Sequence, residues 1–381
     1  MILKALKYTR YTGNIREWSI VGNNDDYAYF DNINLLVGKN ASGKSRTLNV
    51  IRVIAGLLSG QISLTDTSCP TEKFELVFHD GKNKYDYFLE YEDREIRNES
   101  LYQNEHLVFD RIKKKLHDID GNIQQWPDLK DNALIITLSK DDGSSFYPSF
   151  VRWGQTLKNY LFSNQIEKNS LVKDYINIEK GNYDVKDVSI LIYTFYIGKR
   201  TFGESFITEI KDCMHQLGYD QISNIDIQKN KDGYGICAEE YGQYSVMQRE
   251  MSQGMFRALA LFIMLIYAKM SNTSLCILVD DMGEGLDFER STGIIDIVIK
   301  EIHNSNIQFF MTTNDRHIMN KIPLRFWTVI DRERSKSVLY DYPNSKEVFE
   351  DFKYTGLSNF DFLATDFYSK GFGTIEEESE N

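Results

Sequence analysis

Several features that would assign a protein to a class at once are scarce or missing in this sequence. The four cysteines, Cys69, Cys213, Cys237 and Cys276, form no CxxC pair, which favours reduced thiols over disulfides or zinc ligands. Basic residues are outnumbered, and the net charge of −12 argues against a surface that binds nucleic acid over its whole extent. The longest strongly apolar run, residues 258–268, is shorter than the roughly 20 residues that span a bilayer. It therefore predicts a buried helix.

Internal repeats and long heptad arrays are also absent, so we expect no coiled-coil arm. The first residues contain no long apolar region of the signal-peptide kind, and we expect a cytoplasmic protein without a membrane partner. What the sequence does have is core material, because 42% of its 381 residues are hydrophobic and 13% are aromatic. This composition predicts a globular protein of one large domain or two smaller ones.

The spacing of apolar residues predicts an alternation of strands and helices. Strand-like runs occur at residues 33–37, 74–78 and 85–89, with a hairpin turn at 79–83 between the last two. The block 150–220 has mainly helical spacing, and strands return near 225–246. An apolar helix at 255–270 precedes a buried strand at 275–279, and a further strand follows at 307–311. The pattern is that of an α/β protein.

Residues 38–45, Gly-Lys-Asn-Ala-Ser-Gly-Lys-Ser, fit the phosphate-loop pattern GxxxxGK[ST]. An apolar strand enters the loop and a helical apolar stripe leaves it, which is the context that the pattern requires. The glycines let the backbone curl around phosphates, Lys44 reaches the β and γ phosphates, and the Ser45 hydroxyl binds Mg²⁺. The predicted nucleotide-binding residues here are Gly38, Lys39, Asn40, Ala41, Ser42, Gly43, Lys44, Ser45 and Arg46.

The buried strand at 275–279 ends in two carboxylates, Asp280 and Asp281. Such a Walker B segment holds Mg²⁺ through Asp280 and places a water through Asp281. Asp287 follows in Gly-Leu-Asp, at the spacing of a D-loop. The alternative is that the two aspartates only cap a turn.

Two further polar sites flank this segment. Upstream, Met-Ser-Gln-Gly-Met at 251–255 opens the apolar helix, so Ser252, Gln253 and Gly254 stand where a helix start can bind a phosphate. The alternative is that Ser252 is an ordinary N-cap residue. Downstream, the strand at 307–311 ends close to Asn314, at the position of a switch residue that touches the γ-phosphate.

With these motifs in place, residues 30–58 and 245–316 resemble the two halves of an ABC-type head, as in SMC, RecF and OLD-family ATPases. The compact form resembles AAA-type ATPases of bacterial anti-phage defence operons, and residues 356–361, Gly-Leu-Ser-Asn-Phe-Asp, add to that impression. The resemblance implies a P-loop NTPase of ABC/SMC-head type, with a mixed central sheet, an antiparallel β lobe and a helical insertion. It also implies ATP and Mg²⁺ as cofactors, and a signature serine that contacts the ATP of a second copy.

On this basis we expect three segments: an N-terminal ATPase lobe with the phosphate loop and β subdomain at 1–115, a mostly helical insertion at 116–245, and a C-terminal ATPase lobe at 246–381. Two departures from the family stand out. Asp281 occupies the position of the usual catalytic glutamate, so we expect slow hydrolysis, with Glu284 as a substitute. Asn314 replaces the usual switch histidine and cannot change its charge.

The leading hypothesis is an ATPase that forms a homodimer across ATP and regulates or scaffolds a separate effector, a nuclease or toxin from the same operon, in anti-phage defence. No fused nuclease motif follows residue 316. The alternative is an SMC/RecF-like DNA-binding ATPase of repair or maintenance, with a local nucleic-acid contact at Arg111 and residues 113–115. A transporter subunit is a third hypothesis, disfavoured by Asn314 and the long insertion.

Overall fold

The computed structural model describes residues 1–117, 121–139, 143–161, 168–169, 171–172, 189–303 and 305–373. The chain forms two compact units, unit 1 with residues 1–157 and 322–381 and unit 2 with residues 158–321. The unit boundaries at 157 and 321 differ from the segment boundaries that we predicted after residues 115 and 245. The three predicted segments remain a prediction. Within 116–245 the described residues form strands as well as helices, and residues 162–167, 170 and 173–188 of that segment lie outside the described part.

Unit 1 is built on one mixed sheet, in the order β4, β16, β17, β2, β1, β5, β6, β7, β8, β9, with β3 paired to β1. The pairs β4–β16 and β17–β2 are parallel, and every pair from β2 to β9 is antiparallel. One part of the sheet therefore contains parallel pairs, and the other part forms the antiparallel lobe that we expected. Its strands are β1 (Ile2–Arg10), β2 (Trp18–Gly22), β3 (Ala28–Tyr29), β4 (Ile33–Val37), β5 (Glu72–His79), β6 (Lys84–Glu92), β7 (Glu95–Gln103), β8 (His106–Asp110), β9 (Lys115–Leu116), β16 (Trp327–Glu333) and β17 (Lys336–Asp341).

The burial pattern of the strands follows from their place in this sheet. All residues of β4 are buried, whereas β5 alternates buried and half-buried residues along its length. A central strand covered on both faces needs a continuous apolar run, and a strand with one covered face needs alternation. Helix α1 (Lys44–Leu58) starts directly after the loop that leaves β4 and buries Leu48, Ile51 and Ile54.

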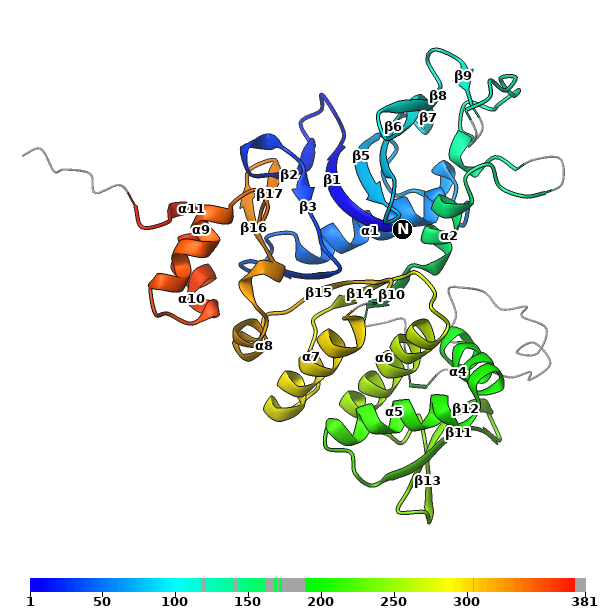
Figure 1. The fold of residues 1–381 in the computed structure, drawn as a ribbon, viewed down its shortest axis with the longest axis vertical. Helices are drawn as coiled ribbons and strands as arrows, with labels where there is room; N and C mark the ends of the chain where they lie inside the picture. The colour runs from blue at the N-terminus through cyan, green and yellow to red at the C-terminus, as the bar shows by residue number, and fades with distance from the viewer. Residues whose placement is uncertain are drawn as a thin grey trace, which may run out of the picture. The chain divides into compact units, whose positions relative to one another are not determined.

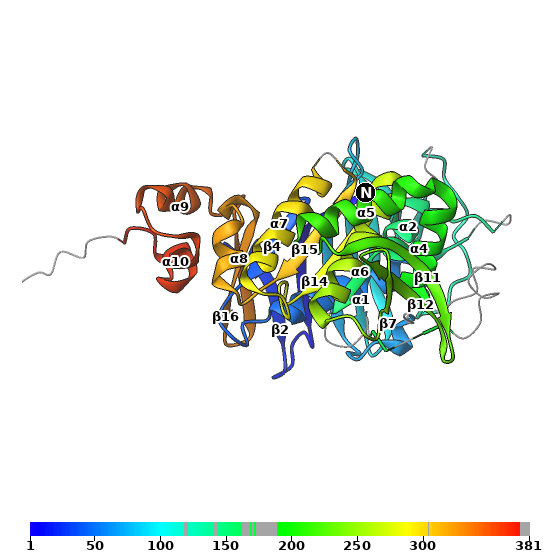
Figure 2. The same ribbon diagram turned by 90° about the horizontal axis from the view of Figure 1, so that it is seen from below.

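The rest of unit 1 packs around these elements. Helix α2 (Pro148–Thr156) packs so closely on α1 that a Cβ at Gly154 would lie 2.2 Å from the Ala55 carbonyl oxygen. The C-terminal helices α9 (Lys346–Asp351), α10 (Asn359–Ala364) and α11 (Phe367–Lys370) gather beside the β16–β17 hairpin (Figures 1 and 2). Edge-to-face ring contacts hold them together, including Phe352 and Phe362 with centroids 5.1 Å apart.

Unit 2 contains a parallel sheet of β10 (Lys158–Leu161), β14 (Leu275–Asp280) and β15 (Ile307–Thr312). A second, antiparallel sheet consists of β11 (Ile222–Asn230), β12 (Gly233–Glu240) and β13 (Tyr244–Met247). The helices of this unit are α4 (Ser189–Phe202), α5 (Glu204–Gln216), α6 (Gln253–Met270), α7 (Phe288–Ile302) and α8 (Arg316–Lys321). Both α4 and α5 pack against α6.

Helix α6 is the core helix of unit 2. It is long and apolar enough to cross a membrane by length and composition, but 78% of its most apolar window is buried inside the protein. The apolar surface of such a buried helix already contacts other parts of the protein, as in the core helix of a globular protein. The buried helix predicted from residues 258–268 is therefore confirmed.

Candidate functional site

The phosphate-loop residues form a tight loop between β4 and α1. Ala41 and Gly43 adopt left-handed backbone conformations, with φ of 61° and 117°. A Cβ at Gly38 would lie 2.4 Å from the carbonyl oxygen of Ile330, and one at Gly43 would lie 2.8 Å from the Ser337 hydroxyl. Both positions therefore need glycine, because the β16–β17 hairpin packs directly against the loop and leaves no room for a Cβ.

Lys44 lies inside the curl of this loop. Its side chain is buried, and its ammonium donates to the carbonyl oxygens of Gly38 at 2.8 Å and Lys39 at 3.4 Å. Among the described residues no side chain caps the start of α1, where Gly43 is the N-cap. The hydroxyl of Ser42 is buried and has no hydrogen-bond partner in the same described part. A curled loop, an internal cation and an uncapped helix start fit a bound phosphate.

The outer face of the loop is exposed, and residues from the C-terminal part of unit 1 contact it. Lys39, Asn40 and Ser45 are exposed, and the Lys39 ammonium forms an ion pair with Asp366 at 2.8 Å. Arg332 donates to the Ala41 carbonyl oxygen at 3.2 Å. Some 300 residues of sequence separate these partners, so the sequence offered no signal for them.

Arg46, the last predicted residue of the loop, lies over the ring of Trp18, with its guanidinium carbon 4.6 Å from the ring centroid. Burial lowers the pKa of Arg46, and the neighbouring cations Arg10 and Arg332 lower it further. Three arginines close to the loop add positive potential to the uncapped start of α1. The sequence analysis did not find Trp18 or Arg332.

In unit 2 the carboxyl ends of β14 and β15 bring the Walker B and switch residues together. The Thr312 hydroxyl donates to the Asp280 carboxylate and accepts the backbone N–H of Asp281, the latter at 2.8 Å. The Asn314 amide donates to the Asp281 carboxylate at 3.3 Å. Because parallel strands end at one edge, residues 31 or more positions apart meet here. Thr312 is a bridging residue that the sequence analysis missed.

The backbone of Asp281 explains the residue found at this position. It has φ of 53°, in the left-handed region that short polar residues tolerate better than most. Aspartate suits this conformation, whereas the longer glutamate of the family has no such local advantage. The aspartate found at position 281 in place of glutamate is therefore consistent with the positive φ of this residue.

Glu284, the predicted substitute for Asp281, is bound by a buried cation. Arg257, on α6 and 5% exposed, donates to the Glu284 carbonyl oxygen at 2.6 Å and to its carboxylate at 3.1 Å. The Glu284 carboxylate itself is 60% exposed. The Glu284 carboxylate is already bound by Arg257, whereas Asp281 lies at the end of β14 beside Asp280 and Asn314, so Asp281 is the better candidate. An arginine inside an apolar helix was the sequence signal for Arg257.

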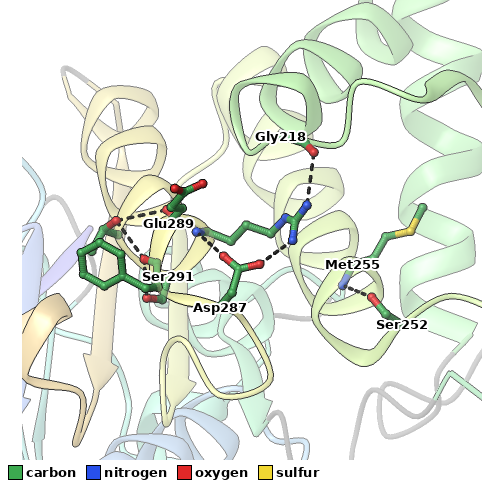
Figure 3. Close-up of polar contacts among 9 residues, drawn as sticks. Gly218, Ser252, Met255, Asp287, Glu289 and Ser291 are labelled. Carbon is green, nitrogen blue, oxygen red and sulfur yellow. Dashed lines mark hydrogen bonds and ion pairs between the residues drawn. The ribbon is translucent and has the colours of Figure 1, made fainter.

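The signature and D-loop residues also meet in unit 2. A Cβ at Gly254 would lie 2.5 Å from the Gly285 carbonyl oxygen, so the start of α6 packs directly on the D-loop. Ser252 accepts the backbone N–H of Met255 at 3.2 Å, as an N-cap does, and Gln253 beside it is exposed. Asp287 caps α7 and pairs with the Arg290 side chain, as Figure 3 shows.

The structure thus groups the predicted residues into two sets, each within its own unit. Unit 1 holds the phosphate loop with Lys44, and unit 2 holds the Walker B, switch, signature and D-loop residues. Ser252 is both an N-cap and part of the predicted signature, so the two interpretations weighed for it are compatible. The roles assigned to individual residues remain predictions.

Comparisons with known proteins agree with this geometry. Residues 33–203 match the family described as "AAA domain, putative AbiEii toxin, Type IV TA system". No curated protein matches the chain. A solved SMC head bound to the C-winged helix domain of ScpA is similar to the chain, with a TM-score of 0.55 at 15% identity, over 89% of this chain and 97% of that one.

An SMC head domain with an extended coiled coil, bound to the C-terminal domain of ScpA derived from Pyrococcus furiosus, is similar as well. Its TM-score is 0.53 at 13% identity, over 92% of this chain and 99% of that one. At such identities the likeness shows the fold, which is that of a P-loop NTPase. The family match over residues 33–203 agrees with a P-loop NTPase fold of the SMC/ABC-head type.

Proposed function

We propose that this protein binds Mg·ATP, hydrolyses it slowly, and forms a homodimer while ATP is bound. The observation that carries the proposal is the phosphate loop, in which Lys44 lies inside the curl and the start of α1 has no side-chain cap among the described residues. Such a loop offers a phosphate the helix amides and one cation at once.

The proposed roles follow the chemistry of each side chain. Lys44 binds the β and γ phosphates, and Ser45 and Asp280 are the Mg²⁺ ligands. Bound Mg²⁺ neutralises charge on the phosphates. Asp281 orients the attacking water, and Asn314 holds the Asp281 carboxylate by its hydrogen bond at 3.3 Å. Aspartate is one methylene shorter than glutamate, so the water lies less favourably and turnover is slow.

The dimer is proposed from the exposed residues at the signature and D-loop. Gln253 and Asp287 are exposed beside Ser252, on a surface that a second copy can meet. In a two-fold dimer the same surface is used by both copies, so two sites are completed together. ATP provides γ-phosphate contacts that ADP lacks, and this difference in affinity drives closure.

Sedimentation of the purified protein with Mg·ATP, with Mg·ADP and without nucleotide tests this proposal. A dimer with ATP that reverts to monomer with ADP supports it. The same oligomeric state under all three conditions removes the nucleotide switch.

We further propose a cytoplasmic role in anti-phage defence, with a separate effector. The matched family's description names a toxin and a type IV toxin–antitoxin system, and the similar SMC heads bind ScpA, a separate protein. Purification of the native complex identifies the effector. Without any co-purifying protein, the effector part of the proposal fails.

The DNA-binding alternative rests on Arg111 and residues 113–115, and the contacts of Arg111 and Lys113 weaken it. Arg111 donates to the carbonyl oxygens of Ala133 and Lys130, and Lys113 pairs with Asp110 at 3.0 Å. Cations that already bind protein groups must give up those contacts to bind phosphates. Stimulation of turnover by duplex DNA would favour this alternative.

A further inference from the structure

The turn that ends α5 reaches the D-loop helix of unit 2. The Arg290 guanidinium pairs with the Asp287 carboxylate and also donates to the Gly218 carbonyl oxygen at 3.3 Å. Figure 3 shows Asp287 and Gly218 meeting this one side chain from two different elements. The same guanidinium lies over the Tyr219 ring, with its carbon 4.5 Å from the ring centroid. One cation therefore joins the D-loop to the turn after α5.

Tyr219 is itself held in place on this turn. Its side chain is buried, and burial raises the pKa of the phenol while the neighbouring Arg290 cation lowers it. The surrounding packing is tight, since a Cβ at Gly293 on α7 would lie 3.2 Å from the Leu217 side chain. The turn at 217–219 thus contacts α7 at both Arg290 and Gly293.

We propose that Tyr219 and Arg290 are positioning residues, which hold the D-loop Asp287 in an arrangement set by the turn after α5. The inference rests on the proposed function, because Asp287 is one of the residues that we propose to meet a second copy. Neither positioning residue needs to touch the nucleotide.

The physical basis is that Arg290 makes three different contacts with one planar group. An ion pair that is about half exposed contributes little alone, but the stacked ring and the carbonyl fix its direction. A displacement of the α5 turn breaks the Gly218 bond and the ring contact together. Asp287 then loses its orientation. Binding of another molecule to α4, α5 or β11–β13 can therefore change the dimer-forming surface without entering it.

The test compares four variants of the full chain. Arg290→Ala removes all three contacts, Arg290→Lys keeps the charge but loses the planar fork, and Tyr219→Phe removes only the hydroxyl. Tyr241→Phe is the matched control, because Tyr241 is an exposed tyrosine of the same unit. For each we would measure the KM for ATP, kcat, ATP-dependent dimerisation, and hydrogen exchange without nucleotide.

In Arg290→Ala we expect kcat and dimer affinity to fall about tenfold, with KM changed by less than about twofold, because the lost contacts are charge-assisted but lie outside the phosphate loop. Arg290→Lys should fall in between. Tyr219→Phe keeps the ring beneath Arg290, so it should match the parent, as should Tyr241→Phe. Without nucleotide, Arg290→Ala should speed hydrogen exchange at 217–220 as well as at 284–290.

Two outcomes overturn the inference: dimerisation and turnover of Arg290→Ala equal to those of the control, or faster exchange at 284–290 with no change at 217–220. The hydrogen-exchange measurement needs no ATP, so it tests the connection between the α5 turn and the D-loop independently of the proposed ATP-dependent dimer. If the parent protein neither dimerises nor turns over ATP, the proposed function fails, while linked exchange still supports the connection between the turn and the D-loop.

Discussion

The starts of α1 and α6 differ in how each helix satisfies its first N–H groups. At α1 the N-cap is Gly43, and the described side chains provide no cap. At α6 the Ser252 hydroxyl accepts the N–H of Met255, and the D-loop packs against Gly254. An uncapped start is ready for an anion, whereas a capped start is already satisfied within one copy. This difference fits the proposed order of events. ATP binds first at the start of α1, and the signature residues at the start of α6 contact the nucleotide only when a second copy binds.

The strongest test of this difference is Lys44→Ala. We expect a loss of ATP affinity of about 100-fold or more, because the cation inside the curl of the loop is removed and the amides of α1 remain. Titration with a fluorescent ATP analogue measures the change. Lys82→Ala is the control, since Lys82 is an exposed lysine of the same unit in the turn between β5 and β6, and its affinity should stay within a few-fold of the parent. Equal effects in the two variants would contradict the role of Lys44.

A change that leaves both helix starts intact is Asp281→Asn. We expect turnover to fall about 100-fold or more with ATP affinity preserved, because a group that orients water or accepts its proton is worth that much. Single-turnover hydrolysis and nucleotide titration measure the two quantities. Glu284→Gln is the matched variant and should keep most of the parent rate, because Arg257 already binds that carboxylate. If Asp281→Asn turned over ATP at the parental rate and Glu284→Gln were inactive, Glu284 and not Asp281 would be the residue that orients the water.

The smallest expected effect concerns the cap itself. Ser252→Ala removes the side-chain oxygen that accepts the N–H of Met255, and we expect the free energy of unfolding to fall by about 1 kcal/mol. Urea denaturation without nucleotide measures it. Ser271→Ala, at the other end of α6, is the control. No loss of stability in Ser252→Ala would mean that the two helix starts do not differ in the way described.

The parts of the fold that could be predicted from the sequence are those coded by local patterns. The apolar runs at 33–37 and 275–279 became β4 and β14, the turn at 79–83 joins β5 to β6, and the phosphate loop lies where its motif placed it. Each of these depends on neighbouring residues, so a window of sequence contains the whole signal.

The contacts that support the site could not be predicted in this way. Arg332 and Ser337 brace the phosphate loop from almost 300 residues away, and Tyr219 reaches Arg290 from the end of another helix. Nothing in the spacing of one sequence records such pairs, because they depend on how the chain folds back. The unit boundaries at 157 and 321 have the same cause, since unit 1 is made of both ends of the chain.

The central claim is that two copies complete each other's nucleotide sites, and mixing two inactive variants tests it most directly. Lys44→Ala lacks the phosphate cation, and Ser252→Arg places a bulky cation on the docking surface while its own phosphate loop is unchanged. Each variant alone should neither dimerise on Mg·ATP nor turn it over. In a mixed dimer one site combines the intact Lys44 of one copy with the intact Ser252 of the other. We therefore predict partial recovery of both dimer and turnover on mixing, and no recovery at any ratio would contradict a shared site.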